Sequence, residues 1–218
     1  MKLEFDDGEL TGIAADALAV PVFSKSEPDA VGTLVQPLRD AGELKGKVGE
    51  LTLLHSPNDF AARRLLLIGC GDDWSTEVAF AFGGQAVRAA KSRGYGQLAL
   101  ALEGDARSAV AGAVAGDFGL EKYRLESDDN ALKTLVVCGS PDGAEAGLVV
   151  GECTNLAREL ACLPANELGP EEFAARAAAD GPAHGLTVSV MGETELRAMG
   201  AGALCSVANG SARPPQLV

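Results

Sequence analysis

The sequence predicts an α/β fold, in which a mostly parallel sheet flanked by helices is followed by a linker helix and an incomplete second α/β domain. Short, continuous apolar runs at 65–68, 98–102 and 135–138 have the length of strands that are buried on both faces. Helical patterns lie between these runs, and strands that alternate with helices favour a parallel sheet. Near residue 145 the pattern changes to a long amphipathic helix. These three observations set the architecture.

The remaining elements of the first part follow from local patterns. Two further strands are expected at 17–23 (ALAVPVF) and 49–55 (GELTLLH), with a weaker helix at 28–39 between them. A helix at 76–93 carries an apolar stripe, and a second helix at 105–117 opens with an acidic residue suited to its N-terminus. An exposed loop is expected at 125–130.

The second part begins with the amphipathic helix, whose apolar stripe starts at Val149 and which ends at Pro164. Pro170 and the two glutamates after it mark the start of another helix. The segment LTVSV at 186–190 alternates like a half-buried strand, and ETELRAMG at 193–200 is typical of a short helix.

The chain stops on GSARPPQLV, in which two prolines hold the backbone extended. Residues 216–218 therefore have the pattern of a strand that has only begun. We expect Leu217, Val218 and the apolar faces of 151–213 to be under-packed in this chain alone.

Composition excludes several classes of protein. A formal net charge of -13 over 218 residues argues against binding to duplex DNA or to an anionic membrane, because both need clustered basic residues. No apolar run reaches the length of a membrane helix, and acidic residues stand where a signal peptide would have its hydrophobic stretch. A cytoplasmic location is expected. The five cysteines are widely spaced in apolar strings, which favours buried free thiols over disulfides or metal ligands.

No catalytic motif is complete. Gly46-Lys47 is followed by valine rather than serine or threonine, which argues against a phosphate loop. A Gly-x-Gly turn ends at Gly71, but Trp74 occupies the position of the third glycine of a dinucleotide fingerprint. The two histidines, His55 and His184, do not form a zinc-binding helix motif, and no Gly-x-Ser-x-Gly element occurs. Adjacent acidic pairs are more typical of solvated turns than of metal sites.

Two segments carry a resemblance to a known family. The stretch NLARELACLPANELGPEEFAARA at 155–177 and the stretch MGAGALCSVANGSARPPQLV at 199–218 resemble the leucyl aminopeptidase family, peptidase M17. The segments 46–72 and 115–124 are similar to the more variable N-terminal domain of that family. One departure is ACLPANELGP, where many relatives have Asn-Thr before the first proline and threonine before the later one.

The resemblance implies a macro-domain-like N-terminal domain at 1–148, a linker helix at 149–168 and the truncated start of a metallopeptidase catalytic domain at 169–218. The complete family removes N-terminal amino acids from peptides, with two divalent metals, zinc or manganese, in a hexamer. Its metal ligands lie in a later segment that includes an Asn-Thr-Asp-Ala-Glu-Gly-Arg motif, which this sequence lacks. We therefore assign no catalytic, cofactor-binding or metal-binding residue.

Three hypotheses remain. The first is the N-terminal portion of an M17 aminopeptidase, inactive alone, with a structural or oligomerisation role. The second is a standalone macro-like binding or scaffold module without peptidase activity. The third, DNA binding, is disfavoured by the net charge of -13.

Overall fold

The computed structural model describes residues 1–119 and 131–218, so the loop expected at 125–130 lies outside the described residues. The chain divides into two compact units, 1–157 and 158–218. Within the described parts, no helix is both long and apolar enough to cross a membrane.

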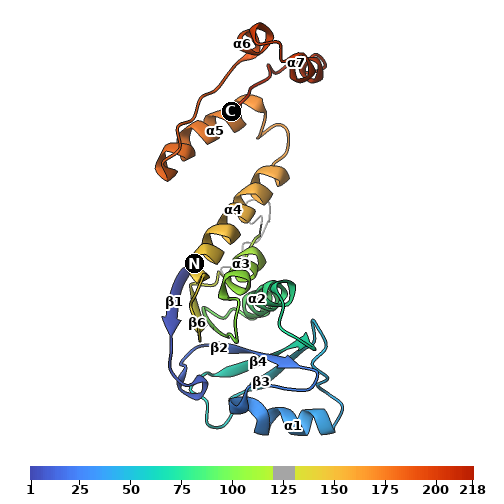
Figure 1. Ribbon diagram of the computed structural model, residues 1–218, viewed down its shortest axis with the longest axis vertical. Helices are drawn as coiled ribbons and strands as arrows, with labels where there is room; N and C mark the ends of the chain where they lie inside the picture. The colour runs from blue at the N-terminus through green and yellow to red at the C-terminus, as the bar shows by residue number, and fades with distance from the viewer. Residues whose placement is uncertain (120–130) are drawn as a thin grey trace. The chain divides into compact units, whose positions relative to one another are not determined.

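The first unit is built on one six-stranded sheet with the order β1-β6-β5-β2-β4-β3 (Figure 1). Every neighbouring pair is parallel except β3 and β4, which form an antiparallel hairpin. The mostly parallel sheet predicted from the apolar runs is confirmed. The strands are β1 (Lys2–Asp6), β2 (Ala17–Phe23), β3 (Leu51–His55), β4 (Arg64–Gly71), β5 (Gln97–Ala101) and β6 (Thr134–Cys138).

The sequence patterns did not predict β1. Its residues alternate between charged and apolar side chains, with Lys2, Glu4 and Asp6 between Leu3 and Phe5. The strand lies at the edge of the sheet and pairs only with β6. An edge strand needs no continuous apolar run, so it lacks the signal by which the central strands are found.

Helices cover both faces of the sheet, as the alternation of strands and helices predicts. The helices α2 (Thr76–Lys91) and α3 (Ala106–Gly116) pack on one face, and α1 (Gly32–Asp40) lies on the other (Figure 1). Ser75 caps α2, because its side chain accepts a hydrogen bond from the Val78 backbone N–H group. Asp105 caps α3 in the same way and accepts from the Ser108 N–H group.

The central strands alternate between two apolar clusters. In β4, Leu66, Ile68 and Cys70 face α2 and α3, whereas Leu65 and Leu67 face the α1 side. Successive side chains of a strand point to opposite faces, so a strand that is covered on both faces must be apolar throughout. This is the physical origin of the runs seen in the sequence.

Helix α4 (Ala144–Cys162) begins earlier than the apolar stripe suggested. Ala144, Gly147 and Gly151 are its buried residues, because the helix approaches α3 closely enough for small residues only. Leu156 of the predicted apolar stripe is 40% exposed, in agreement with the expected under-packing of this segment.

The second unit is largely helical. It contains the end of α4, α5 (Pro170–Asp180), a 3-10 turn η4 (Gly181–His184), α6 (Glu193–Ala198) and α7 (Gly202–Ala208). The helix α5 starts at the predicted proline, but α7 was not predicted, because a segment rich in glycine and alanine has no amphipathic period.

The prediction of a strand at 186–190 is wrong. The segment is irregular and leads only to a single antiparallel bridge between Met191 and Leu217. An alternating pattern becomes a strand only where a neighbouring strand pairs with it along its length. Leu217 and Val218 are 40% and 47% exposed, as expected for an under-packed end.

Candidate functional site

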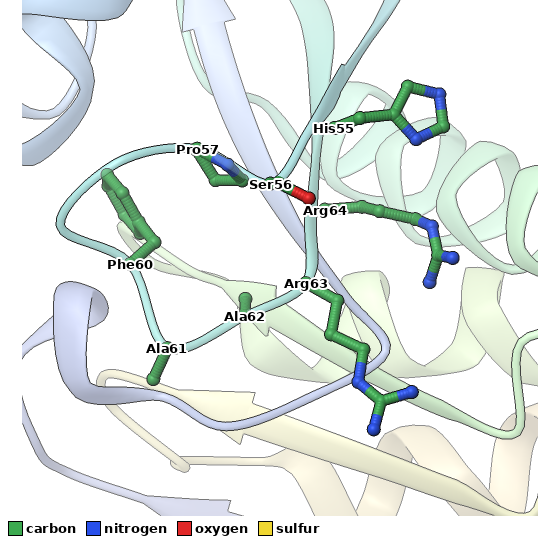
Figure 2. Close-up of a pocket in the computed structure, with 8 residues that line it drawn as sticks. All are labelled: His55, Ser56, Pro57, Phe60, Ala61, Ala62, Arg63 and Arg64. Carbon is green, nitrogen blue, oxygen red and sulfur yellow. The ribbon is translucent and has the colours of Figure 1, made fainter.

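The β3–β4 hairpin bears a hollow of about 350 Å³ that is lined by basic and apolar side chains (Figure 2). His55 and Arg64 lie opposite each other in the β3–β4 pairing and point to the same side. Phe60, in the loop between the two strands, also lines the hollow. The Arg64 guanidinium lies 4.5 Å from the centre of the Tyr95 ring and donates to the Asp16 carbonyl at 3.3 Å. This arrangement fixes Arg64 to the sheet, so its guanidinium is already engaged within the protein.

The carboxyl edge of the parallel strands is a second candidate site. In open α/β sheets, ligands bind where the strand order reverses, here between β2 and β5. These strands pair only over Ala17–Ala19, so they separate toward their carboxyl ends. Pro21 lies beyond that pairing, where its missing N–H costs no hydrogen bond to β5.

Trp74 fills the space at this switch point. Its indole N–H donates to the Gly104 carbonyl at 3.2 Å. Its ring meets Phe23 and Phe82 edge-on, with centroids 6.1 and 5.5 Å apart. The residue that replaces the third glycine of a dinucleotide fingerprint thus packs where a ligand would enter such a fold.

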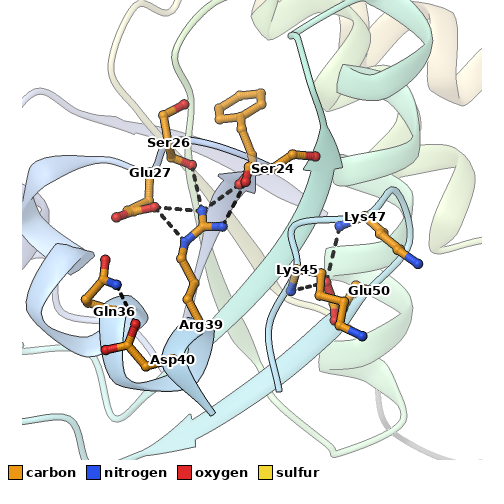
Figure 3. Close-up of polar contacts among 10 residues, drawn as sticks. Ser24, Ser26, Glu27, Gln36, Arg39, Asp40, Lys45, Lys47 and Glu50 are labelled. Atoms are coloured by element: carbon orange, nitrogen blue, oxygen red, sulfur yellow. Dashed lines mark hydrogen bonds and ion pairs between the residues drawn. The ribbon is translucent and has the colours of Figure 1, made fainter. Parts of the chain in front are cut away.

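The loop after β2 is held by Arg39 (Figure 3). Its guanidinium donates to the backbone carbonyls of Phe23, Ser24 and Ser26 and forms an ion pair with Glu27 at 2.7 Å. All these partners belong to the end of β2 and the loop after it, so the arginine serves to order this segment rather than to bind an anion.

The Gly46-Lys47 segment also has backbone N–H groups that are hydrogen-bonded within their own loop. The Glu50 carboxylate accepts hydrogen bonds from the backbone N–H groups of Lys45 and Lys47 at 2.9 and 3.2 Å (Figure 3). A phosphate loop would offer such amides to its ligand. The fold therefore supports the prediction that this segment is not a phosphate loop.

The buried titratable groups are poorly suited to nucleophilic catalysis. Burial raises the pKa of the Cys70 thiol and of the Cys138 thiol to about 12, so both stay protonated near neutral pH. Burial also raises the pKa of Glu103. Cys153 and Cys162 are exposed, which contradicts the expectation that every cysteine is buried, and all five are free.

Several carboxylates of the second unit are engaged with cations or helix ends. Glu172 bonds Arg213 and the Gly169 N–H, and Glu195 bonds the Gly192 N–H. Glu193 pairs with Arg197 at 2.6 Å.

Among residues 1–119 and 131–218, no three histidine, cysteine, aspartate or glutamate side chains converge as metal ligands. The acidic pairs Asp6-Asp7 and Asp72-Asp73 belong to no such group, and the pair Asp128-Asp129 lies outside the described residues. A two-metal centre needs several convergent oxygen or nitrogen donors. The described residues therefore do not fit the pair of metals implied by the family resemblance.

Comparison with known proteins places these features in a family. Residues 11–127 match the model of the cytosol aminopeptidase family, N-terminal domain, and residues 155–218 match the model of the catalytic domain of the same family. A probable cytosol aminopeptidase of Solibacter usitatus is 33% identical over 100% of this chain and 48% of its own length. A probable cytosol aminopeptidase of Chelativorans sp. is 35% identical over 82% of this chain and 39% of its own length.

Solved structures agree with the fold. The bottromycin maturation enzyme BotP superposes with a TM-score of 0.76 at 28% identity, over 93% of this chain and 45% of its own. A tomato leucine aminopeptidase mutant superposes with a TM-score of 0.77 at 22% identity, over 99% of this chain and 49% of its own, which supports the fold alone. The chain spans about half the length of the curated relatives it matches. The chain belongs to the cytosol aminopeptidase family, peptidase M17.

Proposed function

We propose that this chain is the N-terminal portion of an M17 aminopeptidase and that the 218 residues alone do not hydrolyse peptides. One observation carries the proposal: the chain matches both family models in order, yet its described residues bring no metal-ligand group together. In this proposal the first unit has a structural or oligomerisation role in a hexamer. The domain boundaries proposed are 1–148, 149–168 and 169–218.

The complete enzyme would act in the cytosol on the N-termini of peptides. The names of the relatives as cytosol aminopeptidases support the location and the substrate class. Zinc or manganese would be its metal, and a solved structure of BotP in complex with Mn supports manganese. The ligands for that metal would come from residues other than those described here.

Hydrolysis of leucine p-nitroanilide tests the proposal. The purified 218-residue chain, with added Mn²⁺ or Zn²⁺, is expected to show no turnover above the rate of buffer and metal alone. The full-length relative from Solibacter usitatus, assayed in the same buffer, is the positive control. Metal-dependent turnover by the 218-residue chain would contradict the proposal that it is inactive.

The alternative, a standalone macro-like binding module, predicts a ligand at the switch point. The packing of Trp74 between Phe23 and Phe82 does not favour it. Because Trp74 is the single tryptophan of the chain, its fluorescence during titration with ADP-ribose reports directly on this place. A saturable change in that signal would support the module; an unchanged signal is expected.

A further inference from the structure

One of the five asparagines of the chain stands directly before a glycine, in the pair Asn209-Gly210. The other four, all followed by residues that carry a side chain, are Asn58, Asn130, Asn155 and Asn166. Asparagine is a thermolabile residue, because its side-chain amide can react with the backbone nitrogen of the next residue. A glycine at that position has no Cβ atom to hinder the approach. The sequence therefore distinguishes one asparagine as the most reactive.

The fold leaves this pair accessible to solvent. Helix α7 ends at Ala208, and Asn209 and Gly210 form the turn that follows it. Both residues of the turn are exposed. A Cβ atom at Gly210 would meet nothing within 4 Å among the described residues. Water and base can therefore reach the two reacting groups in the native chain.

Neither reacting group is held by a hydrogen bond. Among the described residues, the Gly210 backbone N–H and the Asn209 side-chain amide have no hydrogen-bond partner. The nearest turn contact is made by Ser211, whose N–H donates to the Ala208 carbonyl at 2.9 Å. The nitrogen that attacks and the carbon that it attacks are thus not engaged elsewhere.

The reaction requires the turn to open. Asn209 has a helical ψ of -23°, and the Gly210 nitrogen reaches the side chain only after rotation about this bond. The rotation breaks the exposed hydrogen bond between Ser211 and Ala208. Exposed helix ends open at a low cost in free energy, and glycine accommodates the change in backbone direction. The native turn can therefore reach the reactive geometry without unfolding of the chain.

We propose that Asn209 is a site of spontaneous deamidation in the native chain. The Gly210 nitrogen attacks the Asn209 side-chain carbonyl carbon and forms a C–N bond, which closes a succinimide ring. The side-chain NH2 group leaves with the proton of the Gly210 N–H as ammonia. Water then opens the ring at the side-chain carbonyl to give aspartate, or at the backbone carbonyl to give isoaspartate. Water is the only co-reactant, and no atom is oxidised or reduced.

The reaction changes both the charge and the backbone at the end of α7. Either product carries a carboxylate at the C-terminal end of the helix, where the helix dipole disfavours negative charge. Isoaspartate also adds a carbon to the main chain between α7 and the segment in which Leu217 bridges to Met191. This inference goes beyond the peptidase proposal and does not depend on it, because the reaction needs neither substrate nor metal.

Peptide mapping by mass spectrometry measures the reaction. The full 218-residue chain is incubated at mildly alkaline pH under native conditions, and samples are digested with pepsin in acid, because base promotes the attack. The peptide that contains residue 209 is expected to convert with first-order kinetics to both aspartate and isoaspartate. Asn166 is exposed but precedes glutamate, and Asn155 donates to the Val114 carbonyl at 2.7 Å. Both are internal controls and are expected to stay intact over the same period.

Gly210→Ala tests the role of the glycine. The added methyl group has room in the fold, but it hinders the approach of the nitrogen, so the rate at residue 209 is expected to fall at least about tenfold. Gly192→Ala is the matched control, since a Cβ atom there also meets nothing within 4 Å in the described parts of the chain. It is expected to leave the rate unchanged. Far-ultraviolet circular dichroism checks that both variants fold.

Three outcomes would overturn the proposal. The first is a native chain in which residue 209 stays intact, whether or not the same chain reacts when it is unfolded in urea. The second is aspartate as the sole product, which would indicate direct hydrolysis by water instead of attack by the Gly210 nitrogen. The third is an equal rate in the Gly210→Ala variant and the wild-type chain.

Discussion

Cys70 and Cys138 show how the environment of a single residue sets its chemistry. Cys70 lies one residue before the end of β4 on the α2–α3 side of the sheet, and Cys138 ends β6 on the α1 side. Both are 1% exposed, and burial raises the pKa of each thiol to about 12 from an ordinary value of 9.0. These thiols behave as small apolar groups.

The shift predicts a loss of stability at alkaline pH. Below pH 9 the thiols are protonated in the folded and the unfolded chain, so their contribution is fully present. Between pH 9 and about 12 only the unfolded chain ionises, and the free energy of unfolding falls. Urea denaturation at several pH values measures the slope, which the Cys70→Ala, Cys138→Ala variant should reduce.

Alkylation of the native chain supplies the control. Iodoacetamide should modify the exposed Cys153 and Cys162 and leave Cys70 and Cys138 unmodified, as read by mass spectrometry. Equal labelling of all four would contradict the burial that underlies the prediction.

At the scale of elements, the contact between α2 and α3 depends on glycine. A Cβ atom at Gly83 would lie 1.9 Å from the Ala109 carbonyl oxygen, and one at Gly112 would lie 1.9 Å from the Phe80 carbonyl oxygen. The backbones of the two helices therefore touch where these residues face each other. Both helices cover the same face of the sheet, so their spacing sets the packing of that layer.

Gly112→Ala is expected to lower the free energy of unfolding by about 1–3 kcal/mol, because the helices must move apart. The higher helix propensity of alanine offsets part of this loss. Gly12→Ala is the control, since a Cβ there meets nothing within 4 Å. Urea denaturation measures both, and an equal effect of the two changes would contradict the role given to the close contact.

At the scale of the whole molecule, the two units differ in their apolar cores. The sheet of the first unit separates two clusters of buried side chains. In residues 158–218, all of which the structure describes, the buried apolar side chains are Ala174, Leu196, Cys205 and Pro215. Burial of apolar surface is the main stabilising contribution to a fold, so the second unit has much less to hold it together.

Hydrogen exchange followed by mass spectrometry should reveal this difference. Backbone amides of α5, α6 and α7 are expected to exchange faster than those of β4, β5 and α2, because local opening of the second unit exposes few apolar groups. Equal protection of α5 and α2 would show that the second unit is stabilised by contacts other than those seen here.

The elements that the sequence predicted are those whose burial imposes a pattern. β2, β4, β5 and β6 are apolar on both faces, so four strands were found within a few residues of their ends. β1 and α7 have no such pattern and were missed. The segment 186–190 has the pattern of a strand but lacks a partner along its length. No site residue was predicted, and the places that the fold offers for a site depend on contacts between distant segments.

The sequence by itself determined the alternation of strands and helices, the mostly parallel sheet and the resemblance to M17 aminopeptidases, because these depend on local periodicity and on short motifs. The tertiary structure alone decided the order of the strands and the position of Trp74 at the switch point. Strand order and edge position result from pairing between residues far apart in the chain. Local periodicity carries no information about such pairing.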